Sequence, residues 1–172
     1  MKKISTKQLV SMGLLIAMDI VLNRFLSIKT DSLSIGLDFI PMVVAAMLYG
    51  PIAAATVHGL ADIIGAIAIP RGAYFPGFTV SAVLMGLVFG LLLYKKERSF
   101  WRMCLAVGIS QYVIALFITS FWLTIYLGSF YWVQVTTRIV QIVVVSAAQI
   151  VVVPILGQLV NRLDKALKLR EA

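Results

Sequence analysis

Residues 139–160 read IVQIVVVSAAQIVVVPILGQLV, a stretch of the chain that contains no charged residue. Crossing the hydrocarbon core of a bilayer takes about 20 residues of α-helix, so the stretch is long enough to span it. A transmembrane β-strand would instead need roughly ten residues in which apolar and polar side chains alternate, and no such alternation is present. The stretch therefore predicts a membrane-spanning helix.

The rest of the chain has the same character. Hydrophobic residues make up 61% of the sequence and charged residues 13%, with a mean hydropathy of +1.00, whereas soluble domains carry about 25% charged residues. We therefore predict an all-α integral membrane protein. Six transmembrane helices are expected, over residues 6–27, 39–49, 52–69, 79–94, 101–127 and 133–160. No linker or internal repeat divides them, so residues 1–172 are expected to form a single transmembrane domain.

The positive charge of the chain lies mostly beside these apolar blocks. The net charge is +8, and eleven of the 15 cations fall in three flanking clusters. The clusters are Lys2, Lys3 and Lys7; Lys95, Lys96, Arg98 and Arg102; and Arg162, Lys165, Lys168 and Arg170. Cytoplasmic flanks of membrane helices are enriched in Lys and Arg, which explains the charge better than nucleic-acid binding does. Both termini are therefore expected in the cytoplasm, with loops 28–37, 70–78 and 128–132 outside.

Four cations remain, and all of them fall at or near the outer side: Arg24, Lys29, Arg71 and Arg138. Ionisable groups within membrane helices cost several kcal/mol and usually face the bundle interior or a wet cavity. Guanidinium groups can bind a carboxylate through paired N–H donors. The four cations therefore indicate an anionic ligand that arrives from outside the cell.

Three of these cations also have a simpler interpretation, whereas Arg71 is favoured for a functional role by the loop in which it lies. Arg138 can pair with Asp62 or Asp19, although Gln134 and Gln141 on the same helix face make a longer polar stripe than an ion pair requires. Arg24 can snorkel to the interface. Lys29 fits a solvated loop charge.

Loop 70–78, PRGAYFPGF, contains two prolines, two glycines and three aromatic residues. Such a loop is a shaped turn that can present Tyr74, Phe75 and Phe78 as flat faces for stacking on a heterocycle. The alternative is an aromatic belt at the membrane interface. A belt explains Trp122, Tyr126, Tyr131 and Trp132 equally well.

The sequence offers little support for catalysis or metal binding. His58 and Asp62 lie one helical turn apart, where an interhelical polar contact is favoured over a proton relay. The chain has one His and one Cys, and Cys104 fits a small packing residue. No protease, hydrolase or phosphate-loop motif occurs, so we predict neither an enzyme nor a cofactor.

Several segments resemble the folate-specific S component of energy-coupling factor (ECF) vitamin transporters. They are NRFLSI at 23–28, FIP at 39–41, YGP at 49–51, DIIG at 62–65 and, most specifically, GAYFPGFT at 72–79. The resemblance implies a six-helix membrane subunit that binds folate near the extracellular side. It also implies an importer of the cell membrane of a bacterium, whose transmembrane coupling subunit and two ATPases lie on other chains.

The resemblance also implies functional positions. Gly13 and Ala17, with small-xxx-small spacing, are similar to the surface that docks on the coupling subunit. Aromatic rings of the outer loop would stack on the pterin, and the outer arginines would bind the glutamate carboxylates. The expected ligand-binding residues are Arg24, Arg71, Gly72, Tyr74, Phe75, Phe78, Thr79, Trp122, Arg138 and Gln141.

Two other functions stay open at this point. The same kind of subunit can bind a different ring-containing vitamin, such as riboflavin or biotin, although a neutral ligand leaves the outer cations unexplained. A self-sufficient proton-coupled transporter would use His58 or Asp62 as its relay, but transporters built from inverted repeats show two related halves, which the sequence lacks.

Overall fold

A computed structural model describes residues 6–29, 34–70, 73–96 and 99–171. The helices are α1 (Thr6–Arg24), α2 (Phe39–Tyr49), α3 (Pro51–Ala68), α4 (Pro76–Leu93), α5 (Phe100–Gly108), the π-helix η1 (Ile109–Ile118), α6 (Thr119–Leu127) and α7 (Tyr131–Glu171). Strands β1 (Ile28–Lys29) and β2 (Ser34–Ile35) pair antiparallel between α1 and α2.

Six helical segments make up the bundle, as the sequence predicts. Five are long and apolar enough to span a membrane, with α5, η1 and α6 forming one of them over Phe100–Leu127. The sixth, α2, has 11 residues, or about 16 Å of helix, which is roughly half the bilayer core. α2 is apolar throughout and supplies much of the buried core, including Met42, Val43 and Ala46. It is therefore the centre of the bundle rather than a lipid-facing span.

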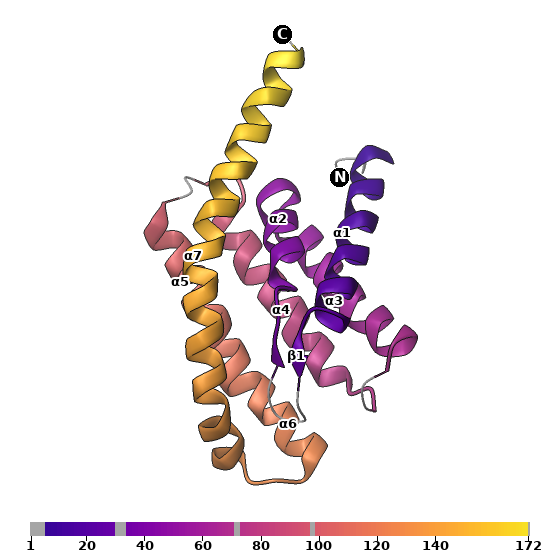
Figure 1. Cartoon of the computed structure of the whole chain (residues 1–172), viewed down its shortest axis with the longest axis vertical. Helices are drawn as coiled ribbons and strands as arrows, with labels where there is room; N and C mark the ends of the chain where they lie inside the picture. The colour runs from indigo at the N-terminus through magenta and orange to yellow at the C-terminus, as the bar shows by residue number, and fades with distance from the viewer. Residues whose placement is uncertain (1–5, 30–33, 71–72, 97–98, 172) are drawn as a thin grey trace.

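The topology matches the one predicted from charge. Figure 1 shows both termini at one end of the molecule, together with the α2–α3 turn and the connection from α4 to α5. The β1–β2 hairpin, the α3–α4 connection and the α6–α7 connection lie at the other end. The first end carries those members of the basic clusters that the structure describes, and it is cytoplasmic; the second end faces outward.

Close packing of α3 on α4 fixes one wall of the bundle. A Cβ placed on Gly86 would lie 2.6 Å from the backbone nitrogen of Ala55, and one on Gly90 would lie 2.1 Å from the Cα of Pro51. Only glycine lets the two backbones approach this closely. At the start of α3, Gly50 has φ +95°, a left-handed conformation that suits the sharp Gly50–Pro51 turn.

The structure differs from the expected helices in five main places. The fourth helix, α4, begins at Pro76 rather than 79, so residues 76–78 of the expected outer loop form its first turn. The first helix ends at Arg24 rather than 27, and the hairpin replaces a purely irregular loop. The fifth span contains η1, and the last helix continues to Glu171. α7 has 41 residues, or about 60 Å at 1.5 Å per residue, so its C-terminal part extends beyond the other helices (Figure 1). Pro154 does not interrupt it.

Candidate functional site

A cavity of about 180 Å³ lies among α1, α2, α3, α4, η1, α6 and α7. Its outer part includes Gly36 and Phe78, and its walls carry more polar groups than a membrane core normally does. The charged and polar side chains that line it are Asp19, Asn23, Asp38, His58, Asp62, Ser81, Ser110, Gln111, Thr119, Arg138, Gln141 and Gln149. Burying polar groups is costly unless they find hydrogen-bond partners, so each group needs a structural or a ligand-related reason.

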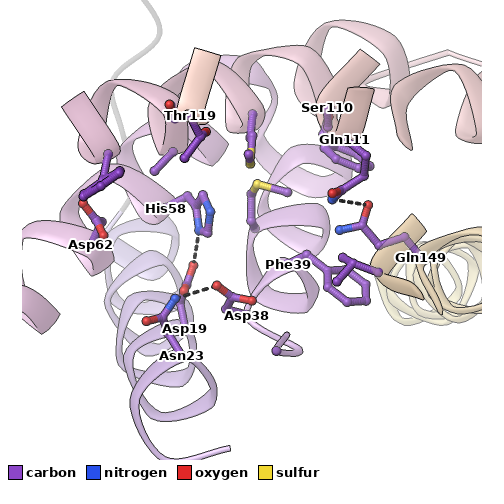
Figure 2. Close-up of a pocket in the computed structure, with 18 of the residues that line it drawn as sticks. Asp19, Asn23, Asp38, Phe39, His58, Asp62, Ser110, Gln111, Thr119 and Gln149 are labelled. Carbon is purple, nitrogen blue, oxygen red and sulfur yellow. Dashed lines mark hydrogen bonds and ion pairs between the residues drawn. The ribbon is translucent and has the colours of Figure 1, made fainter. Parts of the chain in front are cut away.

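Two contacts of α1 form one side of the cavity (Figure 2). Asp19, 1% exposed, lies 2.7 Å from Nδ1 of His58 on α3. The side-chain amide of Asn23 donates to Asp38 at 2.5 Å. The interpretation of His58 as an interhelical polar contact is therefore confirmed, and its partner is Asp19.

Arg138 of α7 is 6% exposed and faces the cavity. Its guanidinium donates to Gln141 at 3.4 Å and to Ser120 at 3.5 Å. A guanidinium has five N–H donors, so two long bonds to neutral acceptors satisfy little of it. Asp19 and Asp62, the carboxylates considered from sequence, bind His58 and Thr79 instead. Arg138 is thus a buried cation with no carboxylate partner among the described residues, at a place where a ligand can provide one.

The π-helix η1 explains how one span presents two widely separated residues to the cavity. In a regular α-helix Ser110 and Thr119 would be about two and a half turns apart, on opposite faces. The wider turns of a π-helix, with i→i+5 hydrogen bonding, bring both to the cavity wall. The Thr119 hydroxyl donates to the carbonyl of Ile114, five residues earlier, at 3.1 Å. π-segments often occur at functional sites, and this one shapes the cavity.

Phe75, in the connection between α3 and α4, packs against rings of α4 and α6. Phe75 contacts Phe78, Trp122 and Tyr126, with ring centroids 5.6, 6.0 and 6.2 Å apart. The backbone N–H of Ala73 donates to the Tyr126 hydroxyl at 3.1 Å. Phe78 also lines the cavity. These four rings, the aromatic cluster, therefore adjoin the outer end of the cavity, which a belt would not require.

A short hydrogen-bond chain fastens the same loop to α3. The Tyr74 and Thr79 hydroxyls are 2.9 Å apart, and Thr79 donates to Asp62 at 2.6 Å. Because Asp62 lines the cavity and Tyr74 is 45% exposed, the chain runs from the cavity wall to the surface.

The comparisons with known proteins agree with this architecture. Residues 7–166 match the profile of the family described as "ECF transporter, substrate-specific component". This chain belongs to that family. The folate transporter FolT of Clostridium novyi is 36% identical over 164 residues, covering 95% of this chain and 94% of the relative. FolT of Leuconostoc mesenteroides is 34% identical over 122 residues, covering 70% and 65%.

A solved structure is similar as well. The crystal structure of FolT bound with folic acid superposes with a TM-score of 0.83 at 33% identity, covering 89% of this chain and 92% of that one. The family recognised from sequence is therefore confirmed, as is its multi-pass membrane fold.

The positions expected to bind ligand in this ECF substrate-specific component fall into four groups. Phe78, Arg138 and Gln141 line the cavity. Tyr74, Phe75, Thr79 and Trp122 lie behind it, in the aromatic cluster and the hydrogen-bond chain. Arg24 is buried, and its Nε would be 2.9 Å from a Cβ on Gly65 of α3, so it packs there and does not line the cavity. Arg71 and Gly72 lie outside the described residues.

Other cavity residues were missed from sequence. Gln111 and Gln149 are 6% and 3% exposed, and Nε2 of Gln111 donates to Oε1 of Gln149 at 3.1 Å. Each is an amide in an otherwise apolar span, and this polarity was the feature of the sequence that could have identified it as a cavity residue. Within the described residues no group of three His, Cys, Asp or Glu side chains could hold a metal ion.

Proposed function

We propose that this chain is the folate-binding substrate-specific component of an ECF-type importer in a bacterial cell membrane. Arg138 carries the structural part of the proposal, because it is a buried guanidinium that faces a cavity without a carboxylate partner among the described residues. A relative named a folate transporter that matches 95% of this chain supports the choice of folate over riboflavin or biotin. The role is transport rather than catalysis. Residues 1–172 act as one substrate-binding domain in this proposal.

The polarity of the cavity changes with depth. At the level of Arg138 it offers a cation for a ligand carboxylate. Gln149 lies about 16 Å further along α7, where the lining residues are uncharged amides, a hydroxyl and apolar side chains, namely Gln111, Gln149, Ser110, Met42 and Phe89. A flat heterocycle with N–H and C=O groups suits this deeper part. We therefore place the pterin inward and the glutamate tail toward the outer side, near Arg138.

The outer end must rearrange to admit the ligand. The cavity measures about 180 Å³, whereas pockets for ligands of this size are about 300 Å³ or larger. The aromatic cluster adjoins the outer end through Phe78, and its loop is fastened by side-chain hydrogen bonds that exchange readily with water. Displacement of this loop would enlarge the site without disturbing the α3–α4 contact.

Energy for import would come from partner chains, a coupling subunit and two ATPases. α1 has the exposed surface that such docking needs. Its only buried residues are Asp19 and Arg24, while Leu14 and Met18 are 68% and 45% exposed. Gly13 and Ala17 lie on this exposed side, and nothing lies within 4 Å of a Cβ built on Gly13. We propose that the coupling subunit packs against this face.

Calorimetry of the purified chain tests the assignment. We expect tight binding of folic acid and no comparable binding of riboflavin or biotin; the reverse preference would reassign the ligand. Uptake into liposomes that contain this chain alone separates the subunit from an autonomous transporter. We expect none, and proton-driven accumulation without partner chains would overturn the proposed role.

A further inference from the structure

The hydrogen bond between Gln111 and Gln149 joins η1 to α7 at the deep end of the cavity (Figure 2). Both side chains are more than nine-tenths buried, and Phe39, Met42 and Val145 are among their neighbours in the cavity wall. In such surroundings an amide without partners is costly. Both amides line the cavity, so a bound ligand can reach the groups that they leave unpaired.

The two amides are only half used. Gln111 donates through Nε2 and Gln149 accepts through Oε1. Within the described residues neither amide has another partner, so Oε1 of Gln111 and the N–H groups of Gln149 Nε2 remain for a ligand. Together they offer an acceptor beside a donor, next to the apolar side chains of Phe39, Met42 and Val145.

We propose that Gln111 and Gln149 form the subsite that reads the edge of the pterin carrying positions 3 and 4. This inference rests on the proposed function. In folate that edge presents N3–H as a donor and the 4-oxo group as an acceptor, the complement of the free amide groups. With the glutamate tail pointing outward, the pyrimidine half of the pterin is the end that reaches these glutamines.

The amide pair is also reversible. Rotating both amides by half a turn exchanges N and O, and then Gln149 donates while Gln111 accepts. The mutual hydrogen bond survives, but the donor and the acceptor offered to the ligand change places. A 2,4-diaminopteridine has that opposite pattern, since its 4-amino group donates and its N3 accepts. The subsite therefore accepts 4-oxo and 4-amino pterins alike while rejecting a ring that has no polar group at position 4.

Three ligands that differ only at position 4 test the subsite: folic acid, its 4-amino analogue aminopterin, and the analogue with hydrogen at C4. We expect the unmodified chain to bind folic acid and aminopterin with Kd values within tenfold of each other, and the C4–H analogue at least tenfold more weakly. The double variant Gln111→Met/Gln149→Met should lose at least tenfold for folic acid. It should also bind folic acid and the C4–H analogue equally, within about twofold, because the group that read position 4 is gone.

Gln134→Met is the matched control. Gln134 is a buried glutamine on the same helix whose amide nitrogen donates to Ser129 at 2.7 Å and whose Oε1 has no partner among the described residues. It differs from the proposed pair in that it does not line the cavity. This variant should keep all three affinities. If the double variant does not fold, the single variants Gln111→Asn and Gln149→Asn can replace it, because they keep an amide but shorten its reach. Each should bring the Kd values for folic acid and for the C4–H analogue closer together.

The outcomes separate the two proposals. A variant that binds folic acid like the unmodified chain, or that keeps the full discrimination at position 4, overturns the subsite and leaves folate binding intact. Rejection of aminopterin by more than a hundredfold overturns the reversible pair. Failure of the unmodified chain to bind any of the three ligands overturns the proposed function and the subsite with it.

Discussion

At Arg138 a role in ligand binding can be distinguished most easily from a role in stabilising the fold. Because its protein hydrogen bonds are long and go to neutral groups, we expect Arg138→Ala to weaken folic acid binding at least tenfold, about 1.4 kcal/mol. The affinity of Arg138→Lys for folic acid should lie between those of the unmodified chain and Arg138→Ala, since lysine keeps the charge but lacks the planar fork of donors. The sequence predicts the same loss for Arg71→Ala. Calorimetry measures each.

The control is Arg102→Ala, which removes an exposed cation at the cytoplasmic end of the molecule. It should bind folic acid like the unmodified chain. Equal affinities of Arg138→Ala and Arg102→Ala would remove the argument that the cavity holds an anion.

Asp19 and His58 should behave as a buried pair. Removing one partner leaves the other polar group buried without compensation, which costs about 3 kcal/mol or more. We therefore expect Asp19→Leu to lower the thermal unfolding midpoint in detergent strongly. The double variant Asp19→Leu/His58→Leu should recover much of the loss, because no uncompensated group remains. Losses that simply add would show that the contact contributes nothing of its own.

For single residues, the sequence indicated which charged side chains are unusual, but it did not predict their hydrogen-bond partners. Arg138 was identified because it lies on the side of the membrane that the insertion rule leaves poor in cations. Its pairing could not be deduced, because Asp19, Asp62 and Ser120 are distant in the chain and only the packing of four helices selects among them. The contact between Gln111 and Gln149 was not predicted for the same reason, because the two residues lie far apart in the sequence.

At the scale of elements, apolar length predicted where the spans lie but not their internal geometry. The segment 101–127 was expected as one helix, and it does form one span. The change from α5 to η1 has no clear signal in apolar periodicity, because apart from Ser110 and Gln111 the buried and the exposed residues of η1 are both largely apolar. The segment before α2 was expected as a loop, and two-residue strands are too short for their alternation to be detected.

The α3–α4 contact gives an element-scale prediction at Gly90, for which Gly108 of α5 is the comparison. Gly90→Ala would place a methyl group against the backbone of Pro51, so we expect it to destabilise the fold by about 1–3 kcal/mol. Gly108→Ala meets no atom within 4 Å and should be neutral or slightly stabilising, because alanine favours helix. Thermal unfolding in one detergent compares them. Equal midpoints would mean that the two helices separate without cost.

For the whole molecule, charge distribution was the decisive signal. Three basic clusters placed both termini on the cytoplasmic side, and the arrangement in Figure 1 agrees with that topology. The helix α1 buries little of its surface. Apart from Asp19 and Arg24, all of its residues are at least partly exposed. Met12, Leu15 and Ile16 pack partly buried against the core, and the remaining apolar surface of α1 is suited to packing against another membrane protein.

The last prediction concerns that packing. Small residues let helices approach closely in lipid, so Gly13→Leu or Ala17→Trp should obstruct docking of the coupling subunit. We expect either variant to reduce uptake of labelled folic acid at least tenfold in liposomes that contain the complete importer. Binding of folic acid to the isolated chain should not change, because neither residue lines the cavity. Val151→Trp enlarges a residue of α7 that is 62% exposed and should preserve both activities. Undiminished uptake by both α1 variants would place the docking surface elsewhere, whereas a parallel loss of binding would mean that α1 shapes the cavity rather than the interface.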